Sequence, residues 1–317
     1  MILRIGSRGS QLALWQANHI AALLRAKRHT VDIQIIKTTG DRLQEVTFAQ
    51  VGSKDMFTKE IEEALDAGTI DLAVHSLKDL PTELPEPFAL AATPARVDPR
   101  DALVSTKYTS LSALPEGAKV GTSSQRRRAQ LKALRPDILA VEFRGNVDTR
   151  LRKLGEGQVD AILLAAAGLD RLEKTEWIRE RLDPADFCPA AGQGALAIET
   201  RKGDKKTIAA LAFLDDPDTR FAVTAERAAL AALGGGCQVP IGVYCRVVPG
   251  SKDGVLDGRW DEVFAVVAAP ESGEAVRILH RAPRRGSDPV IFGRVAAQKL
   301  MDAGAGPLLE AAGGVVK

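Results

Sequence analysis

The chain has 317 residues, more than one hydrophobic core usually supports, so two or three domains are expected. Hydrophobic residues make up 45% and charged residues 26%, the composition of a soluble globular protein. An aromatic content of 4% and a net charge of +2 argue against a nucleic-acid binder, so any anion-binding role must come from local clusters of cations.

The N-terminal residues 1–6 lack the basic segment and apolar stretch of a secretory signal. No run in the chain approaches ~18 apolar residues. We therefore expect a cytoplasmic protein that does not enter a membrane.

Two combinations of elements each occur twice. Residues 3–10 predict a strand, a small polar turn and a helix that Ser10 caps, and residues 119–134 repeat this order. Residues 60–74 and 150–164 each predict a helix, a glycine stop and a buried strand. These repeats predict two similar α/β domains with parallel sheets covered by helices on both faces.

The two predicted domains are joined at residues 93–101, where prolines lie close together. From residue 215 on the pattern changes to a small α+β domain with an antiparallel sheet. Its expected elements are a helix over 219–233, strands near 243–248, 263–269 and 275–280, a hairpin turn at 270–273 and a helix near 290–303.

Arginines recur at the predicted strand-to-helix turns. Arg8 follows the first strand, Arg126 and Arg127 follow the second such turn, and Arg144 and Arg150 surround a further glycine turn. A helix N-terminus beside a guanidinium is a receptor for carboxylate or phosphate, so several such receptors predict a polyanionic ligand. Any single one of these arginines is more often a solvated side chain paired with an acid.

A buried strand is predicted to end at a charged pair, Lys78 and Asp79. This is the usual position of functional groups in α/β domains, where Asp79 can accept hydrogen bonds and Lys78 can bind an anion. A turn-capping Asp beside an exposed Lys explains the pair equally well. We interpret His75 as a structural histidine.

Cys237 follows three glycines, which predicts an exposed thiol on a loop that can reach another domain. We expect Cys188 and Cys245 to be buried and inert. The odd, widely spaced cysteines and the four histidines disfavour a disulfide framework, a metal site and a Cys-His hydrolase.

Two weaker signals are a charged stretch over 51–59, carrying Lys54 and Lys59, and Gln193. The first suits a mobile cover over a site, and Gln193 lies between glycines at a second predicted domain crossing.

Together these segments resemble the porphobilinogen deaminase family from about residue 4 to residue 303. The matching motifs are GSRGSQLA at 6–13, HSLKDLP at 75–81, GTSSQRR at 121–127, RGNVDTR at 144–150, GQGA at 192–195 and GGCQVP at 235–240.

The resemblance implies two doubly wound α/β domains like periplasmic ligand-binding proteins and a small C-terminal α+β domain with a three-stranded antiparallel sheet. The expected boundaries are 1–95 with 195–213 for the first domain, 99–189 for the second and 217–317 for the third. The chain is expected to re-enter the first domain after Gln193.

The implied activity is a transferase that condenses four porphobilinogen molecules, releasing ammonia, into hydroxymethylbilane during tetrapyrrole and haem biosynthesis. A dipyrromethane cofactor held as a thioether by Cys237 primes the chain. Asp79 is the expected catalytic residue, because the azafulvene cation left by deamination needs a negative acceptor for its pyrrole N–H. A monomer that binds neither nucleic acid nor membrane is expected.

The carboxylates of cofactor and substrate need cationic and polar partners. The residues expected to bind the cofactor are Lys54, Lys78, Ser124, Arg126, Arg127, Arg144 and Arg150. The residues expected to bind the substrate are Arg8, Ser10, Lys59, Arg126, Arg150 and Gln193.

Two residues depart from the family pattern. Asp55 stands where glycine is expected in the cover segment, which puts the role of Lys54 in doubt, and Gly234 stands where Glu is expected before Gly-Gly-Cys.

Two other classes of protein remain as alternatives. The same turns and arginines suit a non-catalytic, two-lobed anion receptor, although such a protein is usually exported. A nucleic-acid binder that contacts only the backbone is disfavoured by the near-zero net charge.

Overall fold

The computed structural model describes residues 1–39, 58–235, 239–252 and 255–312. Contacts divide the chain into two compact units. Unit 1 comprises Met1–Val97, Asp170–Glu173 and Gly194–Arg220, and unit 2 comprises Asp98–Leu169, Lys174–Gln193 and the chain from Phe221 on.

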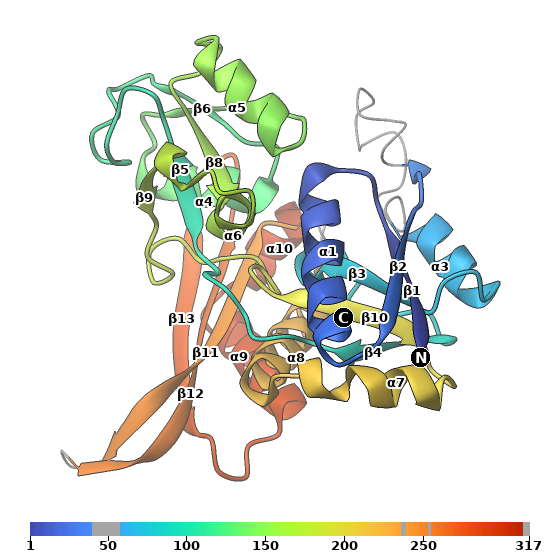
Figure 1. Cartoon of the computed structure of the whole chain (residues 1–317). Helices are drawn as coiled ribbons and strands as arrows, with labels where there is room; N and C mark the ends of the chain where they lie inside the picture. The colour runs from blue at the N-terminus through green and yellow to red at the C-terminus, as the bar shows by residue number, and fades with distance from the viewer. Residues whose placement is uncertain (40–57, 236–238, 253–254, 313–317) are drawn as a thin grey trace. The chain divides into compact units, whose positions relative to one another are not determined.

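Unit 1 is built around one five-stranded sheet with the order β2-β1-β3-β10-β4 (Figure 1). β1, β2 and β3 are parallel, and β10 is antiparallel to both of its neighbours, β3 and β4. The strands are β1 (Ile2–Ser7), β2 (Thr30–Ile35), β3 (Leu72–Ser76), β4 (Phe88–Ala92) and β10 (Leu196–Arg201). The helical elements are α1 (Gln11–Ala26), α3 (Lys59–Asp66), η1 (Leu77–Asp79), α7 (Lys205–Leu211) and η3 (Ala212–Leu214).

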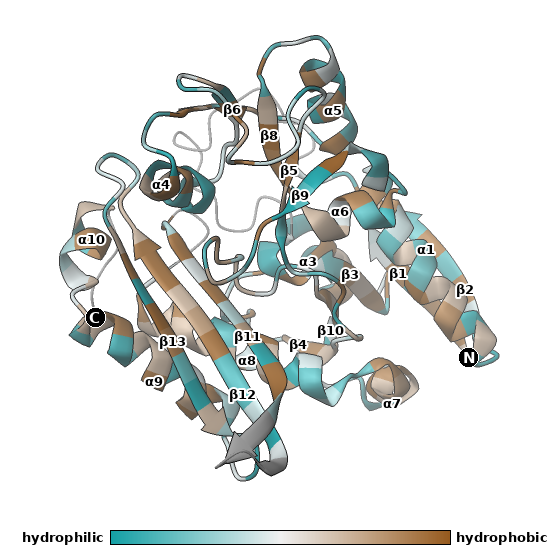
Figure 2. Cartoon of the chain, turned by 90° about the vertical axis from the view of Figure 1, so that its left-hand side faces the viewer, coloured by the Kyte–Doolittle hydropathy of each residue, from teal (hydrophilic) through white to brown (hydrophobic). Residues whose placement is uncertain are grey.

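Apolar side chains of unit 1 gather on both faces of this sheet. Ile20 and Leu24 of α1 join the cluster that contains Leu3 and Ile5 of β1, and α3 contributes to a second cluster with Ile70. Figure 2 shows both hydrophobic and hydrophilic residues along α1, as expected for a helix with one buried face. The predicted cover of helices on both sheet faces is confirmed for this unit.

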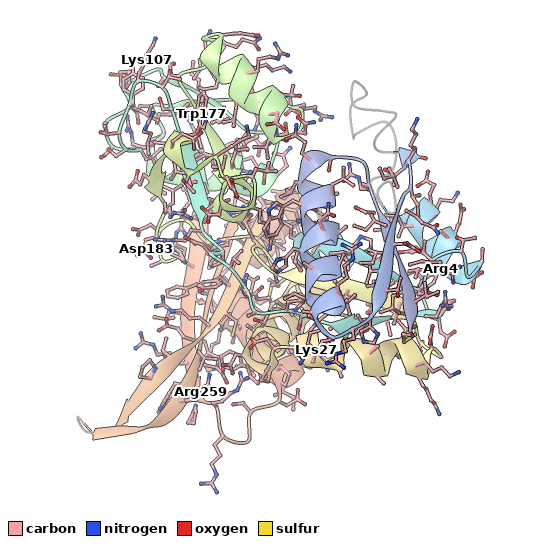
Figure 3. All side chains as sticks on the ribbon, in the orientation of Figure 1. Arg4, Lys27, Lys107, Trp177, Asp183 and Arg259 are labelled. Carbon is pink, nitrogen blue, oxygen red and sulfur yellow. The ribbon has the colours of Figure 1, made fainter. Side chains whose placement is uncertain are left out.

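A charged pair joins the start of β3 to β1. Arg4, labelled in Figure 3, donates from Nη2 to Asp71 Oδ1 at 2.7 Å and from its backbone N to Asp71 Oδ2 at 2.8 Å. These bonds hold adjacent parallel strands in register, so their C-terminal ends lie at the same edge of the sheet.

Unit 2 contains a second five-stranded sheet, with the order β7-β6-β8-β5-β9. Its strands are β5 (Asp101–Val104), β6 (Lys119–Gly121), β7 (Leu139–Val141), β8 (Ala161–Ala165) and β9 (Ile178–Arg181). Its helical elements are α4 (Gln125–Leu134), α5 (Val147–Gly155), α6 (Ala166–Arg171), whose last two residues belong to unit 1, and η2 (Thr175–Trp177).

The two five-stranded sheets correspond strand for strand. β1, β2 and β3 take the places of β6, β7 and β8, and β10 takes the place of β5 as the single antiparallel strand. The predicted repeats therefore fall on equivalent elements, which confirms two similar doubly wound α/β folds. The sheets are mixed, however, and not wholly parallel as the apolar runs suggested, because a strand beside each chain crossing inserts in the opposite direction.

The C-terminal part of unit 2 is the predicted α+β fold with a three-stranded antiparallel sheet, in the order β11-β12-β13. Its elements are α8 (Pro217–Ala232), which belongs to unit 2 from Phe221 on, β11 (Ile241–Lys252), β12 (Val255–Ala268), β13 (Ala275–Pro283), α9 (Pro289–Asp302) and α10 (Gly306–Ala311). Of the described helices, none is both long enough and apolar enough to cross a membrane.

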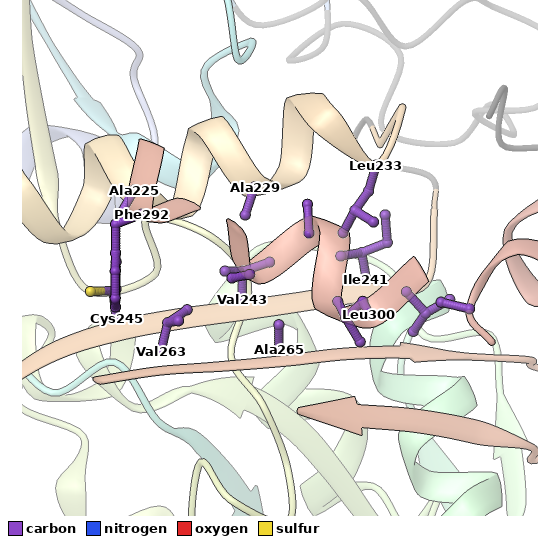
Figure 4. Close-up of a cluster of buried hydrophobic side chains, with 14 of the residues drawn as sticks. Ala225, Ala229, Leu233, Ile241, Val243, Cys245, Val263, Ala265, Phe292 and Leu300 are labelled. Atoms are coloured by element: carbon purple, nitrogen blue, oxygen red, sulfur yellow. The ribbon is translucent and has the colours of Figure 1, made fainter. Parts of the chain in front are cut away.

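One face of the three-stranded sheet packs against α8, α9 and α10. In Figure 4, side chains such as Val243 and Ala265 point from the strands toward these helices. A Cβ at Gly293 of α9 would lie 2.1 Å from the carbonyl oxygen of Ala225 in α8, so the two helix backbones touch. Cys245 is buried in this cluster, as predicted.

The other face of this sheet packs in part against α4. Ala129 of α4 and Cys188 form a buried cluster with Val266 and Ala268 of β12. Helix α4 is therefore fixed on one side by the three-stranded sheet and on the other by its own five-stranded sheet.

Candidate functional site

In unit 1, the predicted site residues lie at the C-terminal edge of β1 and β3. Arg8 is half-buried in the turn after β1, and Ser10 caps α1 by accepting a hydrogen bond from Ala13 N at 3.3 Å. Lys78 and Asp79 follow β3 directly in η1, with Asp79 exposed. Because β1 and β3 are adjacent and parallel, the structure brings these four residues to one edge.

The segment that carries Asp79 is held by its neighbours. Leu77 is buried and donates its N–H to Ala195 O at 3.0 Å, and Leu80 N donates to Leu77 O at 3.1 Å. Gln16 of α1 donates from Nε2 to Ser76 Oγ at 2.8 Å. The carboxylate of Asp79 thus projects from a short, fixed helix and can accept hydrogen bonds from a ligand.

His75 has a structural partner, which confirms the interpretation made from the sequence. Its Nε2 lies 3.0 Å from Oε2 of Glu199 on β10, and both side chains are buried. The pair joins β3 to β10 below the segment that carries Asp79.

In unit 2, the corresponding edge is formed by β6 and β7. Ser124 caps α4 by accepting a hydrogen bond from Arg127 N at 3.4 Å, and Ser123 Oγ donates to Phe143 O at 2.9 Å. The second bond joins the turn after β6 to the turn after β7, which leads to Arg144. The structure therefore brings two arginine-bearing turns together.

Arg126 and Arg127 share one buried carboxylate, Asp101 on β5. Arg126 Nη1 lies 2.7 Å from Asp101 Oδ2, and Arg127 Nη2 lies 2.7 Å from Asp101 Oδ1. The two arginines are only 5% and 6% exposed, and Asp101 is fully buried. Burial alone would raise the pKa of Asp101, but the charges of Arg126 and Arg127 outweigh it and hold that pKa well below its usual range.

Arg144 and Arg150 flank the glycine turn before and within α5. Arg144 Nε donates to Glu142 Oε1 at 2.5 Å, and Arg150 Nε donates to Gly145 O at 2.7 Å. Burial, aided by the charges of Arg127 and Arg144, lowers the pKa of Arg150 to about 10. Arg150 forms no ion pair with any residue that the structure describes.

The turn between these arginines requires glycine. Gly145 has a φ of 124°, and a Cβ there would lie 2.7 Å from Cγ2 of Thr149. Asn146 then caps α5 by accepting a hydrogen bond from Thr149 N at 3.0 Å. This local geometry fixes the start of α5 and thereby the position of Arg150.

The other predicted site residues are placed less centrally. Gln193 is buried and donates from Nε2 to Pro99 O at 2.7 Å and to Asp101 Oδ1 at 3.0 Å. Lys59 is exposed at the first position of α3, 4.0 Å from Glu63.

Lys54, Asp55 and Cys237 lie outside the described residues. Gly234, just before the cysteine loop, has a φ of 65°, a left-handed conformation that favours glycine at a helix end. Within the described residues, no three His, Cys, Asp or Glu side chains come together in a way that could hold a metal ion.

Sequence reasoning missed Asp101 and Arg171. Asp101 lies in a crossing with several charged residues, and nothing in its spacing indicates two arginine partners. Arg171 is buried, donates from Nη2 to Gly194 O at 2.8 Å and lies 5.9 Å above the ring of Trp15. Burial lowers its pKa to about 10. No motif distinguishes it from a surface arginine.

Comparison with known proteins matches both halves of the chain to family models. Residues 3–209 match the model described as "Porphobilinogen deaminase, dipyromethane cofactor binding domain", and residues 220–302 match "Porphobilinogen deaminase, C-terminal domain".

Full-length relatives carry the same name. The porphobilinogen deaminase of Syntrophobacter fumaroxidans is 47% identical over 98% of this chain and 97% of its own length. That of Roseiflexus castenholzii is 48% identical over 97% of this chain and 98% of its own length.

Two solved structures, one of a ligand-binding protein and one of a lipoprotein, have a distant likeness to this chain. The methionine-binding protein MetQ has a TM-score of 0.43 at 12% identity, covering 71% of this chain and 94% of its own. Lipoprotein Tp32 from Treponema pallidum has a TM-score of 0.43 at 13% identity, covering 69% and 92%.

Proposed function

The chain belongs to the porphobilinogen deaminase family, and from this premise we propose which of its residues carry the reaction. The enzyme condenses porphobilinogen into a linear tetrapyrrole, with release of ammonia, and it carries a dipyrromethane cofactor. Its product enters tetrapyrrole biosynthesis.

The residues of unit 2 fit a group that bears several carboxylates. Arg150 is partly buried and has no ion pair among the described residues, and the N-terminus of α4 lies beside Arg126 and Ser124. Such donors suit carboxylates held away from bulk water. When bound, the cofactor supplies the pyrrole carbon to which the first substrate is joined.

We assign the remaining binding roles by the same chemistry. The residues proposed to hold the cofactor are Cys237, as a thioether, with Lys54, Lys78, Ser124, Arg126, Arg127, Arg144 and Arg150. The residues proposed to hold porphobilinogen are Arg8, Ser10, Lys59, Arg126, Arg150 and Gln193. Arg171 is added to the substrate set as a buried cation of unit 1 close to the crossing at Gly194.

Asp79 is the proposed catalytic residue. Its exposed carboxylate, fixed at the C-terminal end of β3, is the observation that supports this role. Loss of ammonia leaves a pyrrole that carries positive charge, and a carboxylate can accept its N–H and stabilise that charge. The same group can take up a proton as two rings are joined.

Replacement of Asp79 by Asn tests this role. D79N removes the negative charge with little change of shape, so turnover should fall about 10²- to 10⁴-fold while the melting temperature stays unchanged. The matched control is D66N, which alters an exposed carboxylate at the end of α3 and should leave turnover unchanged. Near-normal turnover in D79N would remove Asp79 from the mechanism.

Intact-mass spectrometry tests the anchor. The purified wild-type protein should carry a covalent adduct, and C237S should lack it and be inactive. C245S is the matched control and should keep the adduct, since Cys245 is buried in the core. An active wild-type protein without an adduct would refute the assignment.

Three further expectations stay proposals. The domain boundaries 1–95 with 195–213, 99–189 and 217–317 predict that limited proteolysis of the full chain cuts between these segments. A monomer predicts a mass near 33.8 kDa by light scattering. A cytoplasmic location predicts recovery with the cytosolic fraction of the source cell.

A further inference from the structure

Asp101 bonds unequally to the two arginines beside it. Arg127 donates from both Nε, at 2.9 Å, and Nη2, at 2.7 Å, to one oxygen of Asp101. The guanidinium edge formed by these two nitrogens, which could bind a carboxylate of a ligand, is therefore already occupied. Arg126 reaches the other oxygen of Asp101 with Nη1 alone, at 2.7 Å.

Backbone carbonyls complete the difference. Arg127 Nη1 donates to Leu163 O at 3.1 Å, so all three of its nitrogens are engaged. Arg126 Nη1 also donates to Cys188 O at 2.6 Å. Within the described part of the chain, Nε and Nη2 of Arg126 have no hydrogen-bond partner, and these two nitrogens form the edge that binds a carboxylate in two parallel bonds.

Charge and burial both keep Asp101 in place between the two arginines. Two adjacent guanidiniums repel each other, and Asp101, fully buried between them, neutralises one of the two charges. The three charged groups together therefore keep one net positive charge. Since Gln193 also donates to Asp101 and to Pro99 O, the carboxylate is fixed from the side of both crossing segments.

We propose that Asp101 is a positioning residue that gives the two arginines different tasks. It occupies the Nε and Nη2 edge of Arg127, so Arg127 contributes to cofactor binding through its charge and not through a two-bond contact. It holds Arg126 with its Nε and Nη2 edge open to a carboxylate of the oligopyrrole. The inference rests on the proposed function, because it takes an oligopyrrole carboxylate as the ligand of Arg126.

The primary test is D101N, which keeps the shape and removes the charge. Two measurements apply: the KM for porphobilinogen, and the rate at which unmodified protein gains the adduct during incubation with porphobilinogen, followed by intact mass. We expect KM to rise and the loading rate to fall, each at least about tenfold. The kcat of the loaded enzyme should change much less, because Arg126 binds this carboxylate equally in the bound substrate and in the transition state.

The matched control is D98N. Asp98 lies on the same crossing and also bonds two arginines, Arg100 at 2.7 Å and Arg181 at 2.9 Å, but it is partly exposed and neither arginine is a site candidate. D98N should leave both KM and the loading rate unchanged. A folded D101N whose KM and loading rate match those of D98N would overturn the inference.

Comparison of the two arginines separates this inference from the proposed function. R126M should raise KM. Both variants remove a partner of the buried Asp101, but R127M should lower the melting temperature more, because Arg127 gives two bonds to Asp101 and one to Leu163 O whereas Arg126 gives one to Asp101 and one to Cys188 O. The double variant D101N/R126M should have a KM no higher than R126M alone; a further tenfold rise would contradict action through Arg126.

Two outcomes decide which idea fails. If R126M leaves KM and loading unchanged, the proposed binding role of Arg126 is wrong, whatever D101N does. If R126M impairs both and D101N impairs neither, only the positioning role is wrong. Should D101N fail to fold, D101E keeps the charge but moves the carboxylate by one methylene, and a wild-type KM in that variant would overturn the inference.

Discussion

Replacement of Arg150 by Met should make the protein more stable and less able to bind substrate. Its pKa of about 10, against an ordinary value of 12.5, corresponds to a cost on the order of 3 kcal/mol for keeping the charge in this partly buried position. The folded-state pKa is the lower one, so the unfolded chain holds the proton more tightly and the whole cost applies at neutral pH.

The expected gain in stability is smaller than this cost. Methionine fills much of the same space but loses the bond from Arg150 Nε to Gly145 O, worth about 1 kcal/mol. We therefore expect the free energy of unfolding of R150M to exceed that of the wild type by about 1–2 kcal/mol. Repulsion from Arg127 and Arg144 is screened by salt, so the difference should shrink as ionic strength rises.

Activity should change in the opposite direction. Loss of a charge-assisted contact to a carboxylate raises KM about ten- to hundredfold. The assays are urea unfolding at two salt concentrations and initial rates against porphobilinogen concentration. R152M is the matched control on the same helix; it removes an exposed pair with Glu156, worth about 0.3–0.5 kcal/mol, and should leave KM unchanged. An R150M protein that is less stable than wild type, with normal KM, would refute the reasoning.

Three further predictions concern the frame of the protein. G293A should destabilise the protein by about 1–3 kcal/mol because its Cβ would meet the Ala225 carbonyl. G155A has open space around the new Cβ and should stabilise the protein by up to about 1 kcal/mol. Thermal unfolding of both variants is the check, and equal melting temperatures would contradict this reasoning. Burial would raise the pKa of Asp71, but its partner Arg4 outweighs burial and lowers that pKa. The carboxylate of Asp71 therefore contributes to stability above its ordinary pKa, and this contribution is lost as the pH falls below that value. Urea unfolding should show that acid reduces the stability of D71N less than that of the wild type. Burial raises the pKa of Cys188 to about 12, so a thiol reagent at pH 8 should label it only after unfolding, and labelling of the native protein at that site would be the contrary result.

Local signals in the sequence were sufficient to predict much of the fold. Ser10 caps the helix expected of it, because a side chain that accepts from the third residue of a helix is a local property, and Ser124 does the same in the repeat of this order. The strand before Lys78 and the hairpin turn at 270–273 were also located correctly. Strands β11 and β12 extend beyond the predicted segments, because the apolar pattern marks only the part that packs on the core.

Long-range pairing was beyond the reach of the sequence. Strand β10 inserts between β3 and β4, and Asp101 meets arginines that lie 25 and 26 residues away. A carboxylate between two guanidiniums has the same letter in the sequence as one in solvent. The arginine pattern therefore located the strand-to-helix turns, but it could not indicate which guanidinium edges are already occupied by hydrogen bonds within the protein.

The place of β10 has a consequence for how the chain matures as it is synthesised. The second five-stranded sheet takes all its strands from residues 101–181, so it can be completed while the ribosome is still making residues farther on. The first sheet, although it begins at residue 2, must wait for residues 196–201, and until then β3 has an open edge and β4 has no neighbouring strand. Of the two five-stranded sheets, the one whose first strand is made first is therefore completed second.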